Sequence, residues 1–317
     1  MAYRFEADED LREAFFRCGR EQLDNAVAAL SEGIAEDPVA AVHSARKAVK
    51  QERSLLRLTR GAMPRKQRRR ENRALRAAAR GLCETRDAEA MIATVTSLSK
   101  RYVGQLPETT FQAIRGQLER VRDRQRDRAG SARDARAVQE LGAVRLRVDD
   151  WKLRRDDWKA IDAGLLRSYR EGRTAFAEAR QRSTAERLHA WRKRAKDLWY
   201  QQRLIAPACG PAVRGQAKDA HQLADLLGDD HDLAELRRTL TRDHVDAAVD
   251  LDAVVKLIDH RRAELQALAF RLGERVYAEK PQAYRRRMQR AWTAGRSIAN
   301  VPREQQPAEL AALTRVV

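Results

Sequence analysis

The chain has few of the residues that interrupt helices or build small disulfide-bonded folds. Its 317 residues include 15 Gly, 8 Pro and 3 Cys, and aromatic residues make up 5%. Scarce Gly and Pro favour long helices, because these two residues destabilise a helix interior most. The cysteines, Cys18, Cys83 and Cys209, are odd in number and far apart. This spacing indicates reduced thiols rather than disulfides or a zinc site.

Two further absences narrow the fold class. No stretch alternates β-branched and polar residues as strands do, and good helix formers dominate most of the chain. No apolar run approaches 20 residues, and no short apolar segment follows basic residues at the N-terminus. We therefore expect no membrane span, no secretory leader and a cytoplasmic location. The sequence predicts an all-α protein.

Acidic residues are nearly missing from two segments of a chain whose net charge is +18. Residues 42–80 hold 14 Lys or Arg against Glu52 and Glu71, and residues 188–218 hold 7 against Asp197. Elsewhere acids and bases nearly cancel, as on ordinary solvated helix faces. Positive charge concentrated in this way indicates a polyanionic partner.

One pattern, H-x-x-R-K-x-x-K, begins at His43 and recurs at His189. Offsets of 0, 3, 4 and 7 place side chains on one side of a helix, so each copy predicts a cationic stripe. An apolar sector beside each stripe predicts the buried side of the same helix. Its members are Val42, Ala45, Val49, Leu55 and Leu56 in the first copy, and Leu188, Trp191, Ala195, Leu198 and Ala206 in the second.

A second basic helix is expected to follow each motif helix and to extend its surface. We predict no catalytic residue, metal ligand or cofactor, and the candidates are all anion-binding residues. In the first half they are His43, Arg46, Lys47, Lys50, Arg53, Arg57, Lys66, Arg69, Arg73 and Arg76. In the second half they are His189, Arg192, Lys193, Lys196, Arg203, Arg214, Lys218 and His221.

The two motifs belong to a longer internal repeat with an offset of 145 to 146. Arg57 aligns with Arg203, Leu82 with Leu227 and Asp87 with Asp232, and an ordered run of such matches is hard to produce by chance. We therefore expect two antiparallel helical bundles, 1–146 and 147–317, related by a pseudo-two-fold axis and enclosing a basic groove or channel. The expected helices are 8–34, 38–60, 64–82, 86–103, 107–140, 148–181, 184–206, 211–227, 231–245, 250–278 and 282–295.

The paired motif helices, each followed by a basic helix and a Leu-x-x-x-[RH]-Asp segment, resemble the CHAD domain family over nearly the whole chain. The resemblance implies two helical bundles around a basic channel, binding of inorganic polyphosphate and, as in some members, association with polyphosphate granules. It assigns binding to the motif cations. Trp199 stands where the first half has Arg53, and Asp225 stands opposite Arg80. We therefore expect weaker anion binding in the second half.

Two other functions remain open on the residues alone. A nucleic acid suits the charge equally well, although the stripes hold almost no Asn, Gln or aromatic residues to read or stack bases. An inorganic polyphosphatase or triphosphatase would need metal-binding carboxylates beside the cations. Asp229, Asp230, His231 and Asp232 are better interpreted as the capped start of a helix than as a metal site. If His43 and His189 are held neutral by neighbouring cations, polyanion binding should strengthen from pH 8 to 6.

Overall fold

The computed structural model describes residues 3–82, 84–128, 131–242 and 249–299, apart from the side chains of 84–87, 125–128 and 131–134. These residues form eleven α-helices and no β-strand, which confirms the predicted all-α fold. In chain order the helices are α1 (Leu11–Ser31), α2 (Pro38–Leu58), α3 (Arg65–Gly81), α4 (Glu84–Arg101), α5 (Glu108–Arg128), α6 (Ser131–Leu146), α7 (Trp158–Gln181), α8 (Ala185–Cys209), α9 (Pro211–Arg242), α10 (Leu251–Val276) and α11 (Pro281–Ala299). A 3-10 turn, η1 (Thr59–Gly61), follows α2.

Short polar side chains fix the starts of several helices. The Asp10 and Asp37 carboxylates accept hydrogen bonds from backbone N–H groups in the first turns of α1 and α2. Pro38 opens α2 directly after Asp37, at the start of the expected helix 38–60. Thr184 caps α8 through the Arg187 N–H, and Gly210, with a φ of 84°, ends that helix. The motif helices therefore have sharply defined ends.

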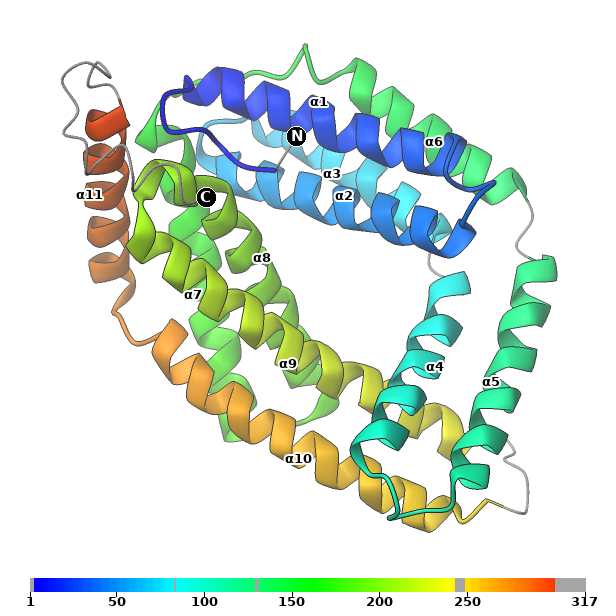
Figure 1. The fold of residues 1–317 in the computed structure, drawn as a ribbon. Coiled ribbons are helices and arrows are strands. Elements are labelled where there is room, and N and C mark those ends of the chain that lie inside the picture. The colour runs from blue at the N-terminus through cyan, green and yellow to red at the C-terminus, as the bar shows by residue number, and fades with distance from the viewer. Residues whose placement is uncertain (1–2, 83, 129–130, 243–248, 300–317) are drawn as a thin grey trace, which may run out of the picture.

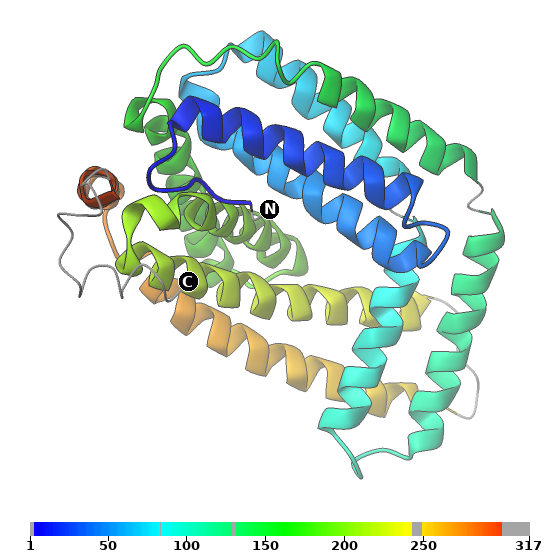
Figure 2. The ribbon, with the colours of Figure 1, turned by 45° about the horizontal axis from the view of Figure 1, so that its top comes forward.

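Two hydrophobic cores hold the helices together. The first joins α1, α2, α3 and α6 to α7, α8, α11 and the N-terminal half of α9. The second joins α4 and α5 to α10 and the C-terminal half of α9. Figures 1 and 2 both show α4 and α5 beside the far ends of α9 and α10. Both cores draw side chains from either side of residue 146, so the division into repeats 1–146 and 147–317 stays a prediction about the sequence.

The expected helix 107–140 is wrong, because the structure has two helices there. Phe111 of α5 belongs to the second core, whereas Leu141 of α6 belongs to the first. The chain must change direction between them to reach both cores. Residues 129–130 lie outside the described part of the chain.

The expected break at 228–230 is also wrong, because α9 continues from Pro211 to Arg242. Asp230 does not cap a helix start. It is 1% exposed, and its carboxylate accepts hydrogen bonds from Arg262 Nε at 3.0 Å and Gln266 Nε2 at 2.8 Å, both on α10. The acidic segment that resembles a helix start in the sequence therefore forms a polar contact between α9 and α10.

The segment before α7 is not helical, although a helix was expected from residue 148. Val148, Trp151 and Leu153 are buried in the first core, and the Arg154 N–H donates to the Ala62 carbonyl at 3.0 Å. Asp157 has a φ of 52°, which stops any helical continuation, and its carboxylate accepts a 2.6 Å hydrogen bond from Trp292 Nε1. The chain thus passes the first core through turns at residues 147–150 and a non-helical segment, and α7 begins after Asp157.

The predicted apolar sectors of α2 and α8 are confirmed, since all ten of their members are buried. The sulfur atoms of Cys18 and Cys209 are buried free thiols, and Cys83 lies outside the described residues. In the part of the chain that the structure describes, no helix has the length and apolar content needed to cross a membrane. The motif helices thus bury one side and leave the other for cations.

We predict that α7 tolerates no side chain at Gly164. A Cβ there would lie 1.8 Å from the Leu58 carbonyl oxygen, so Gly164→Ala should lower the free energy of unfolding by about 3 kcal/mol. Gly215→Ala is the matched control, because nothing lies within 4 Å of its Cβ position. Its better helix propensity should stabilise the protein by up to about 1 kcal/mol in urea titrations. Equal effects of the two changes would contradict the close crossing.

Candidate anion-binding surface

The two motif helices meet at a buried carboxylate, that of Asp197 on α8. Arg57 Nη1 of α2 lies 2.6 Å from Asp197 Oδ1, and Arg194 Nη2 lies 3.4 Å from Oδ2. Ser54 Oγ of α2 also donates to the Asp197 carbonyl at 3.4 Å. The carboxylate thus bridges cations from both halves of the chain, and the sequence had placed it only as the one acid of the second basic segment.

The crossing carries more positive than negative charge. Burial, and then the neighbouring Arg57 and Arg76, lowers the pKa of Arg53 to about 10. Burial also raises the pKa of Asp197, against the opposing effect of Arg57 and Arg194. Arg53, Arg57 and Arg76 were predicted to share a surface, and the structure brings these three together.

The two acids of residues 42–80 do not reach the surface. Glu52 and Glu71 are both 0% exposed. Burial raises the pKa of Glu52 well above its usual value, and the nearby Glu71 adds to the rise, so the neutral form of Glu52 is favoured. Glu71 accepts hydrogen bonds from Arg70 and Arg147. The outward sides of α2 and α3 therefore present cations without acids of their own.

Two of the α2 candidates also hold α2 against α3. Arg46 Nη1 donates to the Leu82 carbonyl at 2.8 Å, and Arg53 Nε donates to Asn72 Oδ1 at 3.1 Å. His43 and Lys47 are exposed, and Lys50 is half-buried. Replacing Arg46 or Arg53 would disturb packing as well as charge, which matters for the choice of test residues.

On α8 the packing divides the predicted stripe between two sides. Arg192 lies over Gly228 of α9, where an added Cβ would be 3.4 Å from its Nε. The next residue, Lys193, instead lines a hollow against α7 together with Arg194 and Arg170. Neighbouring positions on a helix point about 100° apart, so both placements follow once α7 and α9 flank α8.

Two further second-half candidates, Lys196 and His221, lie against the ring of Trp199. Lys196 Nζ lies 5.9 Å from the centroid of Trp199, and the His221 ring lies 3.9 Å from it. His221 Nδ1 also lies 2.6 Å from the Asp225 carboxylate. Arg203 lies near Tyr200 and counteracts the rise of the tyrosine pKa that burial causes. These contacts agree with the expectation that the second half offers less charge to an anion.

His189 is held in its neutral form by its surroundings. Its ring centroid lies 4.2 Å from that of His231 on α9. Burial, and then the positive charge of His231, Lys193 and Arg192, lowers the pKa of His189 to about 4. The neutral state expected from the sequence is therefore more strongly favoured than for an ordinary imidazole. The pH window in which an anion would protonate His189 moves below the expected range of 8 to 6.

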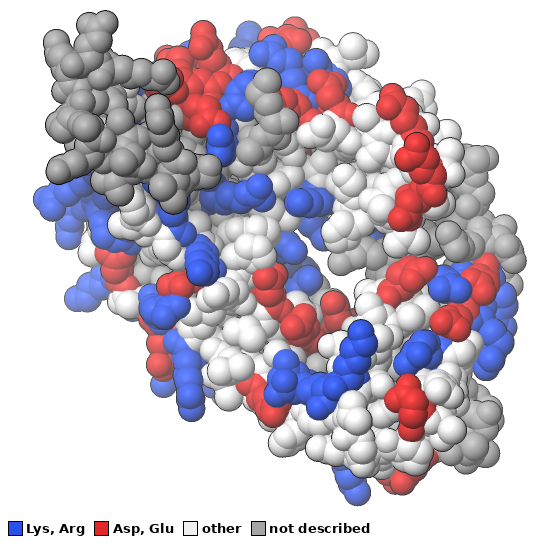
Figure 3. Space-filling model, viewed as in Figure 1, with Lys and Arg blue, Asp and Glu red and all other residues white. Residues whose placement is uncertain are grey.

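His43 lines a pocket of about 700 Å³ between α2, α4, α9 and α10. The charged residues around it are of both signs, with Asp37, Glu89, Asp229 and Asp232 facing Arg101 and Arg261. Figure 3 shows a hollow at the centre of the molecule bordered by side chains of both signs. Among the described residues no three His, Cys, Asp or Glu side chains are placed to hold a metal ion. This pocket connects the first motif to the α9 segment that contacts His189.

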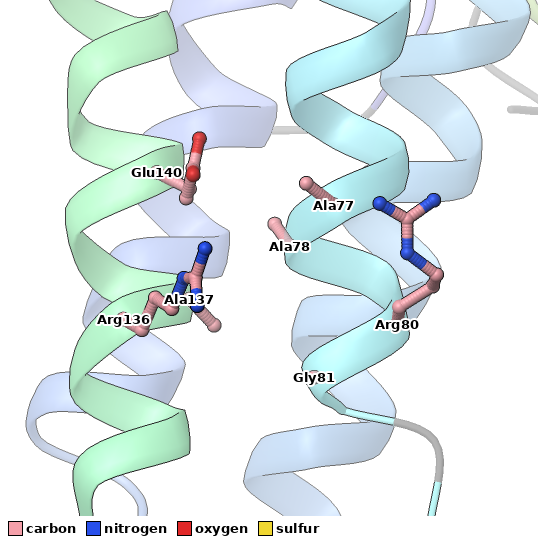
Figure 4. Close-up of a pocket in the computed structure, with 7 residues that line it drawn as sticks. All are labelled: Ala77, Ala78, Arg80, Gly81, Arg136, Ala137 and Glu140. Atoms are coloured by element: carbon pink, nitrogen blue, oxygen red, sulfur yellow. The ribbon is translucent and has the colours of Figure 1, made fainter.

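The other candidates lie on α3 and α9. Lys66, Arg69, Arg73 and Lys218 are exposed, and Arg214 is half-buried. Their membership of one continuous groove stays a prediction. A separate hollow of about 380 Å³ between α3 and α6 is a poor anion site. Figure 4 shows Arg136 and Glu140 together on the α6 side, whereas Arg80 lies on the other side of α3.

Several basic residues near the crossing were missed in the sequence. The positive charge of Arg167 on α7 lowers the pKa of both Arg60 on η1 and Arg68 on α3. Arg194 is the second cation that contacts the Asp197 carboxylate. A signal existed for α7, because Arg167, Arg170 and Arg173 are spaced three apart. It lay outside both motifs, and only packing places α7 beside η1.

The fold and this surface define a helical protein with a localised cluster of cations where its halves meet. The chain belongs to the CHAD domain family, whose model matches residues 17–241. Among solved structures, PptA from Streptomyces chartreusis is similar in fold, with a TM-score of 0.55 and 14% sequence identity over 86% of this chain and 100% of that one. No curated protein matches the sequence.

We predict that Asp197 is needed to hold the cations of α2 and α8 together. Asp197→Asn should lower the free energy of unfolding by about 3 kcal/mol, because it removes the carboxylate paired with Arg57 and leaves Arg194 with Glu171 alone. Added phosphate should restore part of the loss. The control is Asp24→Asn, which breaks an exposed pair with Arg145 and should cost under about 1 kcal/mol. A loss no larger than the control's would contradict the role of Asp197.

A second prediction concerns pH. The folded-state pKa of His189, about 4, lies below that of an unfolded imidazole, so stability is complete above about pH 6.5 and declines as pH falls towards 4. His189→Gln removes this linkage. Between pH 7 and 5 the unfolding free energy of this variant should fall by about 1 kcal/mol less than that of the wild type. This difference is smaller than the full pKa shift would give, because the His189 ring is partly exposed to solvent. The control is His260→Gln, and identical pH profiles of wild type and His189→Gln would refute the assignment.

Proposed function

We propose that the protein binds inorganic polyphosphate along the basic surface of α2, α3 and α8, and that it does so without catalysis. The observation that carries the proposal is the burial of Glu52 and Glu71, which leaves the outward sides of α2 and α3 to cations alone. Membership of the CHAD domain family supports the same ligand. A cytoplasmic location at polyphosphate granules belongs to this proposal.

The ligand chemistry fits the residues present. Polyphosphate offers a regular row of charged oxygens and no bases, so a protein recognises it through charge and hydrogen-bond donors. Forked guanidinium groups such as those of Arg73 and Arg76 suit paired phosphate oxygens, and Lys47 adds a point charge. Each neutralised phosphate releases counterions, so affinity should depend steeply on salt.

The burial of the aromatic residues disfavours nucleic acid as the main partner. Trp199 and Tyr200 are only 9% and 3% exposed and stack on each other, with centroids 4.5 Å apart. Rings buried in this way are not free to stack on bases. Nucleic acid therefore serves as the competitor in the binding test, and the polyphosphatase alternative is addressed by following phosphate release.

The test reverses charge at three exposed positions, Lys47, Arg73 and Arg76, each changed to Glu. The slope of log affinity against log salt concentration for long-chain polyphosphate should become shallower by about 2, since about three phosphate contacts are lost. Fluorescence anisotropy of end-labelled polyphosphate between 50 and 200 mM salt measures this slope. Unlabelled DNA and RNA should displace the label less effectively than polyphosphate.

The matched control makes the same charge change at Arg271, Arg286 and Arg290, which are exposed on α10 and α11. It should retain most of the affinity. An equal loss in the control would show that net charge alone attracts the polyanion, and stronger displacement by nucleic acid would favour the alternative partner. Release of phosphate by the wild type would overturn the non-enzymatic part of the proposal.

A further inference from the structure

A second basic hollow lies outside both predicted stripes, where η1 meets α7. It has a volume of about 580 Å³ and is lined by Arg60, Gly61, Ala163, Arg167, Arg170 and Glu171. Three guanidinium groups from two elements face it, against one carboxylate. A neighbouring hollow shares Arg170 and Glu171 and extends to Lys193 and Arg194 of α8. The α7 side of the molecule thus has an excess of positive charge.

The single acid of the hollow is already shared between two cations. Glu171 Oε1 lies 2.5 Å from Arg167 Nε, and its Oε2 lies 2.6 Å from Arg194 Nη1. Arg60 and Arg170 have no ion pair with any carboxylate of the described residues. Burial, and then the charges of Arg167 and Arg68, lowers the pKa of Arg60. The fold therefore holds these cations together although they repel one another.

The walls of the hollow are fixed by close backbone packing. A Cβ on Gly61 would lie 2.8 Å from the Ala163 Cβ, and one on Gly164 would lie 1.8 Å from the Leu58 carbonyl oxygen. Contacts this close leave η1 and α7 little room to shift. Behind them, Arg68 Nε is buried and has no hydrogen-bond partner among the described residues. The backbone that carries these arginines is thus fixed in position, so little backbone entropy is lost when an anion binds.

We propose that this hollow is a separate binding site for a compact oligophosphate such as inorganic tripolyphosphate. The guanidinium groups of Arg60 and Arg170 can each donate two hydrogen bonds to phosphoryl oxygens. The oxygens of a phosphoryl group are arranged tetrahedrally, so they can accept from several directions, whereas the two oxygens of a carboxylate lie in one plane. None of the six lining residues is aromatic, so a nucleoside attached to the phosphates gains no stacking surface. The site reaches beyond the polyphosphate-binding surface proposed above and does not depend on it.

Isothermal titration calorimetry with tripolyphosphate tests the site in the full chain. The double variant Arg60→Gln and Arg170→Gln removes two donors but keeps the Arg167–Glu171 pair. It should bind tripolyphosphate about tenfold or more weakly than the wild type, because two charge-assisted hydrogen-bond donors are lost. The matched control, Arg286→Gln with Arg290→Gln on α11, should bind as the wild type does. ATP should bind no more tightly than tripolyphosphate, and citrate more weakly.

Several outcomes would overturn this site. They are an unchanged affinity in the double variant, an equal loss in the α11 control, tighter binding of ATP than of tripolyphosphate, or citrate binding as tightly as tripolyphosphate. The variant reversed at Lys47, Arg73 and Arg76 separates the two proposals, because it should keep its tripolyphosphate affinity within about twofold while losing long-chain polyphosphate. A wild type that binds only long chains would refute the hollow and leave the proposed function standing.

Discussion

The structure depends on packing two cationic helices against each other. Two helices of like charge repel, and where α2 and α8 meet the Asp197 carboxylate lies between Arg57 and Arg194. A buried ion pair of this kind contributes little net stability, since desolvation offsets much of the attraction. Its effect is on position, because it fixes where the cations of the two halves come together. The hydrophobic packing of the first core supplies the stability that the crossing lacks.

The distribution of acids gives the surface its character. In the first basic segment the acids are inside, with Glu52 favouring its neutral form and Glu71 bonded to Arg70 and Arg147. In the second half, acids and aromatic rings lie against the cations, as Asp225 does against His221. Two halves with related sequence patterns therefore offer an anion different amounts of charge. The difference between the halves arises mainly from the neighbours of each basic side chain, and only partly from the number of cations in each half.

The pocket of mixed charge at His43 and the basic hollow at Arg60 illustrate two uses of similar residues. Around His43, four carboxylates outnumber two guanidinium groups, so no excess of positive charge remains there. Around Arg60 the one carboxylate is already taken by other cations, so positive potential remains. Both sites are formed by elements distant in the chain. Counting charges along the sequence could distinguish neither from an ordinary helix face.

The sequence by itself determined the all-α class, the positions of α2 and α8, their buried sides and the start of α2 at Pro38, because helix periodicity and the restrictions of proline act over a few residues. The sequence suggested a helix start at Asp230, which was wrong because the Asp230 carboxylate contacts α10 instead of capping a helix. It also suggested one helix across 107–140, which was wrong because α5 and α6 pack into two different cores. Which cations share a site was also left to the tertiary structure. Arg192 and Lys193 are adjacent in the chain, yet Arg192 lies against α9 and Lys193 lines a hollow against α7. The helices that flank α8 come from distant parts of the chain, so a local sequence pattern does not reveal these contacts.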